Sequence, residues 1–493
     1  MNGHHRRAFV LAALLLSCAE AAADREALLI DVLAGADEAL IRARPKLAAG
    51  KYRRMSDDLV SYYRGTLPVW VADWTRAESP ASWSRFALDA PLPVSPGDLH
   101  PENVGILIAR DGTAALEVND LDAVERYPYL WDLRRLATGL VLGARLANAD
   151  DPVAAEATTR AAGSVAGAAV RGYAEAIRTF ADGAPLPRID SGGEQPILVD
   201  LFARSARDLA DRAELTARTV ATGGRRHLAR GAVDPADPSN VQLDLPAFAL
   251  DDLPRLFQEL RSTLVEPPAP DYFTVLDAVR ELGTGVASWP RVRALVLLRG
   301  PGDDDGDDVI VELKELSDAA ALGWLPPGSM ADDVASRVAD ARGRIWARPD
   351  AEPLWGTATW LGLPVQVRTE SEAQKTLRLS RWRGTRGTVP ALLGAAEALG
   401  KLLARVHAAP LPEGGSAAGA IAARIESDPD GFVQEQVEVA VQLAAGVEAD
   451  QALFRQALAR LGPRLGLPVE PGEAPSADVA LWLGDPPDPA AAP

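Results

Sequence analysis

Residues 97–123 read GDLHPENVGILIARDGTAALEVNDLDA, with a polar loop on each side of two short apolar runs. The apolar runs cover 104–109 and 114–118, and Asp111 and Gly112 between them are typical turn residues. This pattern predicts two short strands joined by a turn. Polar residues therefore gather at both ends of the predicted strand pair.

The two polar loops contain the residue types that phosphoryl transfer requires. Such a reaction needs a carboxylate that accepts the proton of the attacking hydroxyl group, and oxygen ligands that hold magnesium. The loop before the strands offers Asp98 and Asn103, and the loop after them offers Asp120 and Asp122. In the alternative interpretation, each acid only caps a turn or the helix that begins near Asp132. Capping accounts for single residues but not for the ordered set.

A glycine-containing loop and a lysine further along the chain form a second candidate group. The loop contains Gly283, Gly285 and Ser288, and Lys314 interrupts the strand-like run VIVELKEL. Glycines let the backbone approach phosphates closely, and a lysine on a neighbouring strand reaches them with a point charge. Only five of the 51 basic residues are lysine, which sets Lys314 apart. The alternatives are an ordinary hairpin turn and an edge-strand lysine that discourages aggregation.

The first polar loop, GDLHPEN, resembles the catalytic loop of aminoglycoside phosphotransferases and other kinase-like enzymes, which read GDLHPGN and continue through a short strand to an Asp. The resemblance implies that Asp98 is the catalytic base, that Asn103 and Asp120 hold magnesium, and that ATP is the phosphoryl donor. Asn119 and Asp122 also match the family's aspartate position. Asp120 is preferred because Asp-Leu-Asp best mimics the Asp-Phe-Gly triplet of kinases, and Asp122 is kept as a further candidate ligand.

The kinase resemblance also implies a fold. Kinases place the glycine loop and the lysine before the catalytic loop, whereas here Asp98 precedes Lys314. We therefore expect an α+β, protein-kinase-like fold of two lobes in permuted sequence order, with the helical lobe first and a small β-rich lobe later. A kinase lysine is normally held by a glutamate on the next helix. The helix expected over 331–341 offers Asp340 but no glutamate, so Asp340 joins the candidate nucleotide-binding residues.

The same motifs, in the same order, resemble a bacterial family known as domain of unknown function 2252. The resemblance spans residues 53–408, and its matching strings are YRG, GDLHPEN, NDLDA, WDLRRLA, LGTG, VELKELS, QVR and LLARVHA. It implies a kinase-like fold and no particular substrate. His407 in the last string matches a family position without a role, and helix packing is the expected reason for it.

We expect five segments along the chain. They are a signal peptide (1–23), a helical lobe with the catalytic and metal loops (24–270), a small β-rich nucleotide-binding lobe (271–375), C-terminal helices (376–465) and a disordered tail (466–493).

Apolar spacing and turn residues predict the individual elements. Helices are expected over 24–49, 131–147, 153–181 and 331–341, and from 390 to 461 with a break at 428–431. Strands are expected at 275–280, 291–298, 309–313, 357–361 and 363–368. Between 185 and 270, proline and glycine clusters are expected to interrupt short helices.

The composition narrows the choice of partners. The chain has 493 residues, a formal net charge of −18 and 47% hydrophobic residues, which is enough for a sizeable core. The negative charge would repel nucleic acid, so we expect no nucleic-acid partner and a small-molecule substrate instead. The predicted function is a kinase-like phosphotransferase that depends on ATP and magnesium and acts on a hydroxyl group.

The first residues indicate export. Arg6 and Arg7 precede an apolar run over 8–16, and the chain's only cysteine, Cys18, follows. This pattern predicts a signal peptide that is cleaved before a lipid-anchored Cys18 or after the small residues 21–23. The protein is then extracytoplasmic, either periplasmic or anchored at the membrane, whereas a misassigned start codon would leave it cytoplasmic. Because ATP is scarce outside the cytoplasm, export favours the alternative function of a ligand-binding protein that keeps the kinase-like pocket without catalysis.

Overall fold

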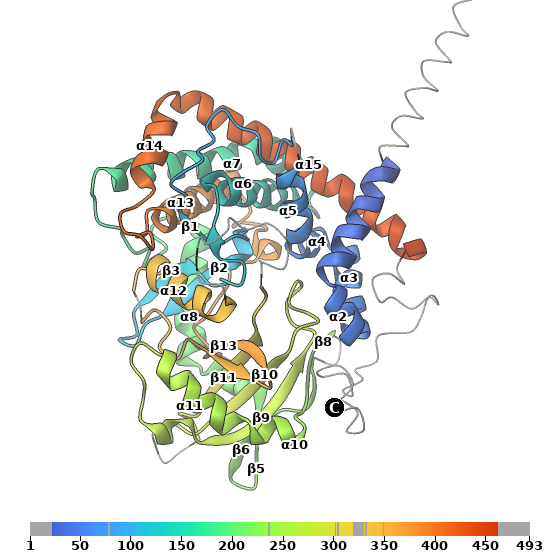
Figure 1. The fold of residues 1–493 in the computed structure, drawn as a ribbon, viewed down its shortest axis with the longest axis vertical. Coiled ribbons are helices and arrows are strands. Elements are labelled where there is room, and N and C mark those ends of the chain that lie inside the picture. The colour runs from blue at the N-terminus through green and yellow to red at the C-terminus, as the bar shows by residue number, and fades with distance from the viewer. Residues whose placement is uncertain are drawn as a thin grey trace, which may run out of the picture. The chain divides into compact units, whose positions relative to one another are not determined.

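A computed structural model describes residues 22–76, 79–234, 237–300, 302, 305–318, 330, 333–348 and 350–461 (Figure 1). The expected tail and Cys18 lie outside these residues, as does the expected signal peptide apart from its last two positions. The chain divides into two units. Unit 1 comprises the chain up to Asp73, Gly285–Pro290 and the chain from Ala445 on, and unit 2 comprises Trp74–Thr284 and Arg291–Ala444.

Unit 1 is built from helices. They are a helix over 22–36, α2 (Glu38–Ala43), α3 (Pro45–Asp57), α4 (Leu59–Gly65), most of α5 (Leu67–Thr75) and the end of α15 (Pro429–Leu461). Leu29, Tyr52 and Phe454 are fully buried in their shared core, and Val286 from the loop Gly285–Pro290 joins it. The helix expected over 24–49 is therefore present in its first part, and the chain then breaks at Asp37 before α2.

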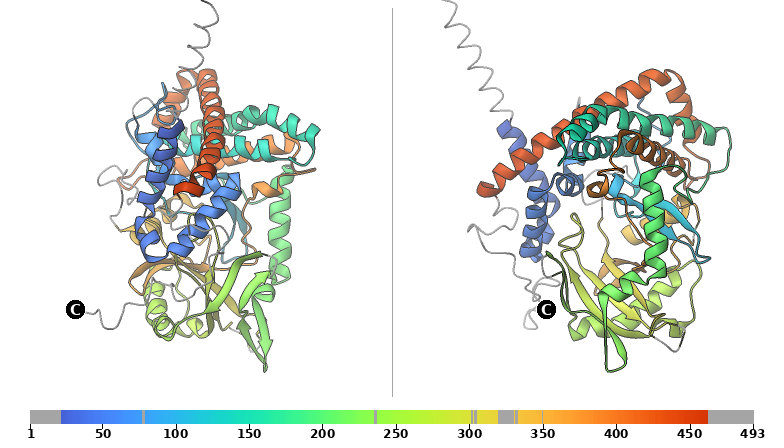
Figure 2. Two further views of the ribbon diagram at one scale, coloured as in Figure 1. Left: turned by 90° about the vertical axis from the view of Figure 1, so that its right-hand side faces the viewer. Right: turned by 180° about the vertical axis from the view of Figure 1, so that it is seen from behind.

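The helical part of unit 2 is a group of closely packed helices. They are α6 (Tyr129–Leu146), α7 (Pro152–Ala181), α13 (Val389–His407), α14 (Ala418–Glu426) and the first part of α15. α7 and α13 lie side by side (Figure 2). A Cβ on Gly400 would lie 2.0 Å from the carbonyl oxygen of Ala169, and one on Gly172 would lie 2.6 Å from that of Glu397. Small residues therefore allow this close approach, and the helices expected over 131–147 and 153–181 are confirmed.

The strand pair predicted from the GDLHPEN region is also present. β2 (Val104–Ile108) pairs antiparallel with β3 (Ala114–Val118). A further chain segment runs along β2, because the backbone nitrogen of Ile106 donates to the carbonyl oxygen of Lys375 at 2.9 Å. A Cβ on Gly105 would lie 2.7 Å from the same oxygen, so glycine is required where the two backbones approach.

Unit 2 also contains a seven-stranded antiparallel sheet with the order β12-β13-β11-β10-β9-β8-β7. The strands are β7 (Gly231–Asp234), β8 (Asp237–Asp244), β9 (Val275–Leu282), β10 (Arg293–Leu298), β11 (Val309–Glu315), β12 (Gly356–Trp360) and β13 (Leu363–Thr369). The last five confirm the five expected strands. Further helices of this part of unit 2 are α8 (Pro196–Ala210), α9 (Ala213–Arg218), α10 (Ala247–Asp251), α11 (Leu253–Thr263) and α12 (Val334–Ile345). Of these, α11 and α12 pack against β12 and β13. Figure 2 shows α8 running between the helical part and the sheet.

Two predictions of local structure are wrong. The region 185–270 contains not only short helices but also β5 (Thr219–Thr222), β6 (Arg225–Leu228), β7 and β8. The helix expected from 390 to 461 is interrupted between α13 and α14. Pro410 in this interval cannot continue a helix, and Gly414 has a φ of 90°, which ends helical geometry.

The mixed α+β class is confirmed, with a helical part and a sheet. The kinase-like arrangement of lobes and their permutation remain predictions. Among the residues described here, no helix is both long enough and apolar enough to cross a bilayer.

Candidate functional site

The start of α6 holds the loop that contains Asp98. The indole nitrogen of Trp131 donates to the carbonyl oxygen of Gly97 at 2.7 Å. The carboxylate of Asp132 accepts from the backbone nitrogens of Gly97 and Leu99 at 3.2 and 3.1 Å. Gly97 has a φ of 80°, and a Cβ there would lie 2.1 Å from a backbone oxygen, so the turn requires glycine. The backbone on both sides of Asp98 is therefore fixed by α6.

The carboxylate of Asp98 is paired with a buried arginine on the same helix. Oδ1 of Asp98 accepts from Nε of Arg135 at 2.6 Å, and the exposed fractions of the two side chains are 16% and 1%. Burial raises the pKa of Asp98 to about 6, although Arg135 opposes the shift. A carboxylate with this pKa is suited to accept a proton near neutral pH.

The β2–β3 hairpin brings Asp120 to the same place. Nδ2 of Asn103 donates to the carbonyl oxygen of Asp98 at 2.9 Å. The carbonyl oxygen of Asn103 accepts from the backbone nitrogen of Asn119 at 3.1 Å. Asp120 follows directly, and its carboxylate is close enough to that of Asp98 to raise the pKa of Asp98. The two polar loops therefore meet at one end of the hairpin.

Lys314 reaches this end of the hairpin from the sheet. It lies on β11, opposite Arg293 of β10 and Gln366 of β13. Its Nζ is 3.2 Å from both carboxylate oxygens of Asp120 and 2.8 Å from Oδ2 of Asp122. The Lys314 side chain is 7% exposed. One buried ammonium group is thus shared by two carboxylates.

The two carboxylates differ in their electrostatic surroundings. Burial would raise the pKa of Asp120, but the charges of Lys314 and Arg368 outweigh this effect and lower it. Burial and the neighbouring Asp120 carboxylate raise the pKa of Asp122, although Lys314 opposes them. Arg368 approaches from β13, where its Nη1 is 3.5 Å from the carbonyl oxygen of Asn119. Asp120 is therefore the carboxylate that stays ionised most readily.

Residues 119–122, named here the acidic loop, offer oxygen atoms of the kind that magnesium takes as ligands. Magnesium takes oxygen ligands and commonly combines one or two carboxylates with substrate phosphates. Oδ1 of Asp122 is buried and has no hydrogen-bond partner among the described residues. Asn103 uses its amide nitrogen for the carbonyl oxygen of Asp98, which leaves its amide oxygen for a cation. In the described part of the chain, no group of three or more His, Cys, Asp or Glu side chains is arranged to hold a metal.

The other predicted nucleotide-binding residues are not among the groups described so far around Lys314. They are Gly283, Gly285, Ser288 and Asp340. Gly283 and Gly285 have φ angles of 74° and 81°, which glycine adopts readily in a turn. Gly285 and Ser288 belong to unit 1, whereas Gly283 belongs to unit 2 with the lysine. Asp340 lies on α12, where its carboxylate is 2.8 Å from Arg344 and 41% exposed. Their roles stay predictions, and the carboxylates that contact Lys314 are those of the acidic loop.

Residues to which the sequence assigned no role in the reaction support the loop 97–103. Asp132 and Arg135 hold the loop, as described above. His407 is fully buried, with Nε2 3.3 Å from Oγ of Ser95 and Nδ1 2.9 Å from the hydroxyl of Tyr173. Burial lowers the pKa of His407, which keeps its ring neutral. The strings WDLRRLA and LLARVHA pointed to these residues, but not to what they contact.

One comparison with known proteins gives a match. The model of a family described as "Uncharacterized protein conserved in bacteria (DUF2252)" matches residues 42–457. No curated protein and no solved structure matches the chain. The match confirms the resemblance to this family, and the resemblance of the catalytic loop to kinase-like enzymes stays a prediction.

Proposed function

The chain belongs to this bacterial family, and from the geometry of its site we propose that it transfers the γ-phosphoryl group of ATP to a hydroxyl group of a small molecule. The supporting observation is that Asp98, Asp120 and Lys314 meet at one end of the β2–β3 hairpin. These side chains would supply a base, an ionised metal ligand and a cation for phosphates, which are the groups that phosphoryl transfer requires.

Asp98 is the proposed base. The acceptor oxygen would bond to the γ-phosphorus, the bond to the β–γ bridging oxygen would break, and the hydroxyl proton would pass to Asp98. Asn103 and Asp120 would hold magnesium, which when bound neutralises negative charge on the phosphates. Arg135 is a positioning residue, because its bond to Oδ1 of Asp98 fixes the carboxylate and favours the ionised form.

The contacts of Lys314 with Asp120 and Asp122 fix where it would bind the phosphates. Its ammonium group lies between Asp120 and Asp122 and has little freedom to move, since the side chain is 7% exposed. The phosphates would therefore bind next to this pair of carboxylates rather than draw the lysine elsewhere. Asp122 would keep Lys314 in place while Asp120 faces the metal.

The proposal predicts a pH dependence set by Asp98. ADP formation from magnesium ATP, measured with a panel of sugars, amino alcohols and nucleosides as acceptors, should fall as the pH drops through about 6, because protonated Asp98 cannot accept a proton. Replacing Arg135 by Gln removes a positive charge that lowers the pKa of Asp98. The acid limb of the pH–rate profile should therefore move to higher pH in Arg135→Gln.

The exposed Arg171→Gln on α7 is the matched control, since it removes the same charge outside the site. Its acid limb should coincide with that of the wild type. If the acid limb of the pH–rate profile is at the same pH in Arg135→Gln as in the wild type, a group other than Asp98 is titrating. The absence of ADP formation with every acceptor would contradict the proposed transfer.

A further inference from the structure

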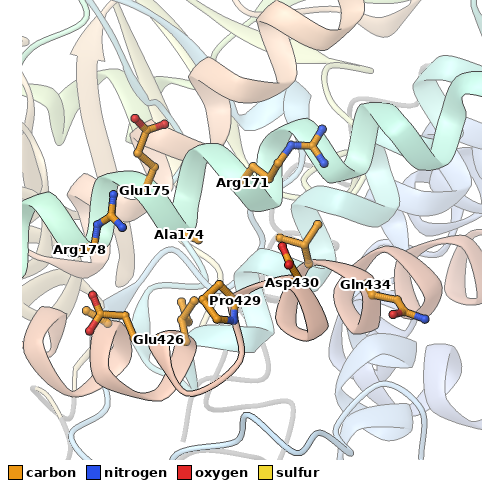
Figure 3. A pocket seen from close by; sticks show the side chains of 11 residues that line it. Arg171, Ala174, Glu175, Arg178, Glu426, Pro429, Asp430 and Gln434 are labelled. Carbon is orange, nitrogen blue, oxygen red and sulfur yellow. The ribbon is translucent and has the colours of Figure 1, made fainter.

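Two pockets border α7. The pocket in Figure 3 lies between α7, α14 and the start of α15, and its charged side chains, among them Arg171, Arg178 and Asp430, are exposed and of both signs. Exposed charges of mixed sign are well solvated and contribute little to selecting a ligand. The second pocket differs because the buried Arg405 and the partly buried Arg188 form part of its wall.

This second pocket, named here the α7–α13 pocket, has a volume of about 490 Å³, which is in the range of small-molecule sites. Its walls come from α7, α8, α13 and the chain 187–195. Phe180, Ile189, Leu198 and Leu402 give it an apolar surface. The pocket can therefore hold the apolar part of a ligand.

Two arginines supply the polar part of the wall. Arg405 is 3% exposed and pairs through Nη2 with the buried carboxylate of Glu117. Arg188 donates from Nη1 to Oγ1 of Thr113 at 3.3 Å. Within the described residues, the Nε atoms of both arginines are buried and have no hydrogen-bond partner. A ligand carboxylate placed beside these two guanidinium groups would make charge-assisted interactions with them, which are stronger than those of a neutral group.

The charges around the pocket favour a ligand with a single negative charge. Glu117 is the buried carboxylate that interacts with both arginines. Lys401 is matched by Glu397, 2.6 Å away, and by the charge of Glu175. Asp190 lines the pocket but is exposed to solvent. Two guanidinium groups against one buried carboxylate leave an excess of one positive charge, which a monoanion would balance.

We propose that the α7–α13 pocket binds a small organic carboxylate, with its carboxylate group on Arg188 and Arg405 and its hydrocarbon part on the apolar wall. The pocket adjoins β3, because the backbone nitrogen of Leu116 donates to the carbonyl oxygen of Ile189 at 2.7 Å. The inference does not rest on the proposed phosphoryl transfer.

Calorimetric titration of the full chain in the absence of nucleotide tests this site. Octanoate, octylammonium and 1-octanol share one hydrocarbon chain and differ only in the head group. Octanoate should bind at least about tenfold more tightly than the other two, because only its head group carries a negative charge that pairs with the arginines. Arg188→Gln should weaken octanoate binding at least about tenfold, and Ala398→Trp should abolish it by filling the pocket. Arg171→Gln on α7 removes an arginine charge outside this pocket, so it is the control and should bind octanoate as the wild type does.

Arg188 and Ala398 are chosen because both are only partly buried, whereas removal of Arg405 would leave the Glu117 carboxylate uncompensated. Equal affinity for the three probes would overturn the proposal, as would wild-type octanoate affinity in Ala398→Trp. The absence of octanoate binding up to 10 mM, roughly ten-thousandfold above a micromolar dissociation constant, would overturn it as well.

Discussion

Asp98→Asn should lower the rate of ADP formation from magnesium ATP by about 10²- to 10⁴-fold, which is the usual contribution of a general base. Asn has the shape of Asp but cannot accept a proton as a carboxylate does. The loop should keep its conformation, because Asp132 and Trp131 hold the backbone on both sides of residue 98. Nucleotide affinity, measured by calorimetry, should stay within about threefold of wild type, since the proposed phosphate and metal ligands are unchanged.

Asp111→Asn is the matched control. Asp111 lies in the turn of the same hairpin, where its carboxylate is 51% exposed and pairs with Arg348. The control removes one negative charge from the same local element but should leave turnover unchanged. Wild-type turnover in a correctly folded Asp98→Asn variant would exclude Asp98 as the base.

The second large effect is expected at Arg134, which precedes Arg135 on α6. Arg134→Met should lower the free energy of unfolding by about 3–5 kcal/mol. Arg134 is fully buried, and its Nε donates to Oε1 of Gln436 at 2.8 Å, while Nη2 pairs with Glu435 at 3.2 Å. Its Nη1 donates hydrogen bonds to the carbonyl oxygens of Pro80, Ala81 and Trp83. Methionine fills similar volume but removes the cation beside the partly buried Glu435 and leaves the carbonyl oxygens of residues 80, 81 and 83 without this donor.

Urea unfolding followed by tryptophan fluorescence measures this loss. Arg160→Met on α7 is the control, because Arg160 pairs with Glu156 on the exposed surface and should contribute little. Arg134→Met and Arg135→Gln replace adjacent residues, yet the first should mainly affect stability and the second the pH dependence of turnover. Equal stability of wild type and Arg134→Met would contradict the support that Arg134 is assigned.

Local sequence patterns predicted the elements around the site well. The hairpin strands were expected at 104–109 and 114–118 and end within one residue of those bounds. Their register depends on a short turn with Asp111 and Gly112, which is a signal contained in neighbouring residues. The order of charged residues in the two loops likewise identified Asp98 and Asp120 as candidates that the fold brings together.

The supporting contacts could not be predicted in the same way. Arg135 and Asp98 are 37 positions apart, and their contact exists only because α6 folds back on the loop that contains Asp98. Lys314 and Asp120 are 194 positions apart, and the sheet must form before they meet. The edge strand β7 and its neighbour β8 were missed because proline and aspartate residues around 234–238 obscure the alternating pattern of a strand. Such residues are tolerated at the edge of a sheet.

Asp120 and Lys314 are proposed to form a site for magnesium and ATP, and the decisive measurement is the thermal unfolding midpoint with and without these ligands. At 100 times the dissociation constant, a ligand stabilises by about 2.7 kcal/mol, which should raise the midpoint by roughly 3 °C or more. Each variant is compared with itself without ligand, so a change in its own stability does not affect the result.

The rise should require both magnesium and ATP in the wild type and persist in Asp111→Asn. It should disappear in Asp120→Asn and in Lys314→Met. No rise in the wild type at millimolar magnesium and ATP, or an unchanged rise in both site variants, would contradict the assignment of this site.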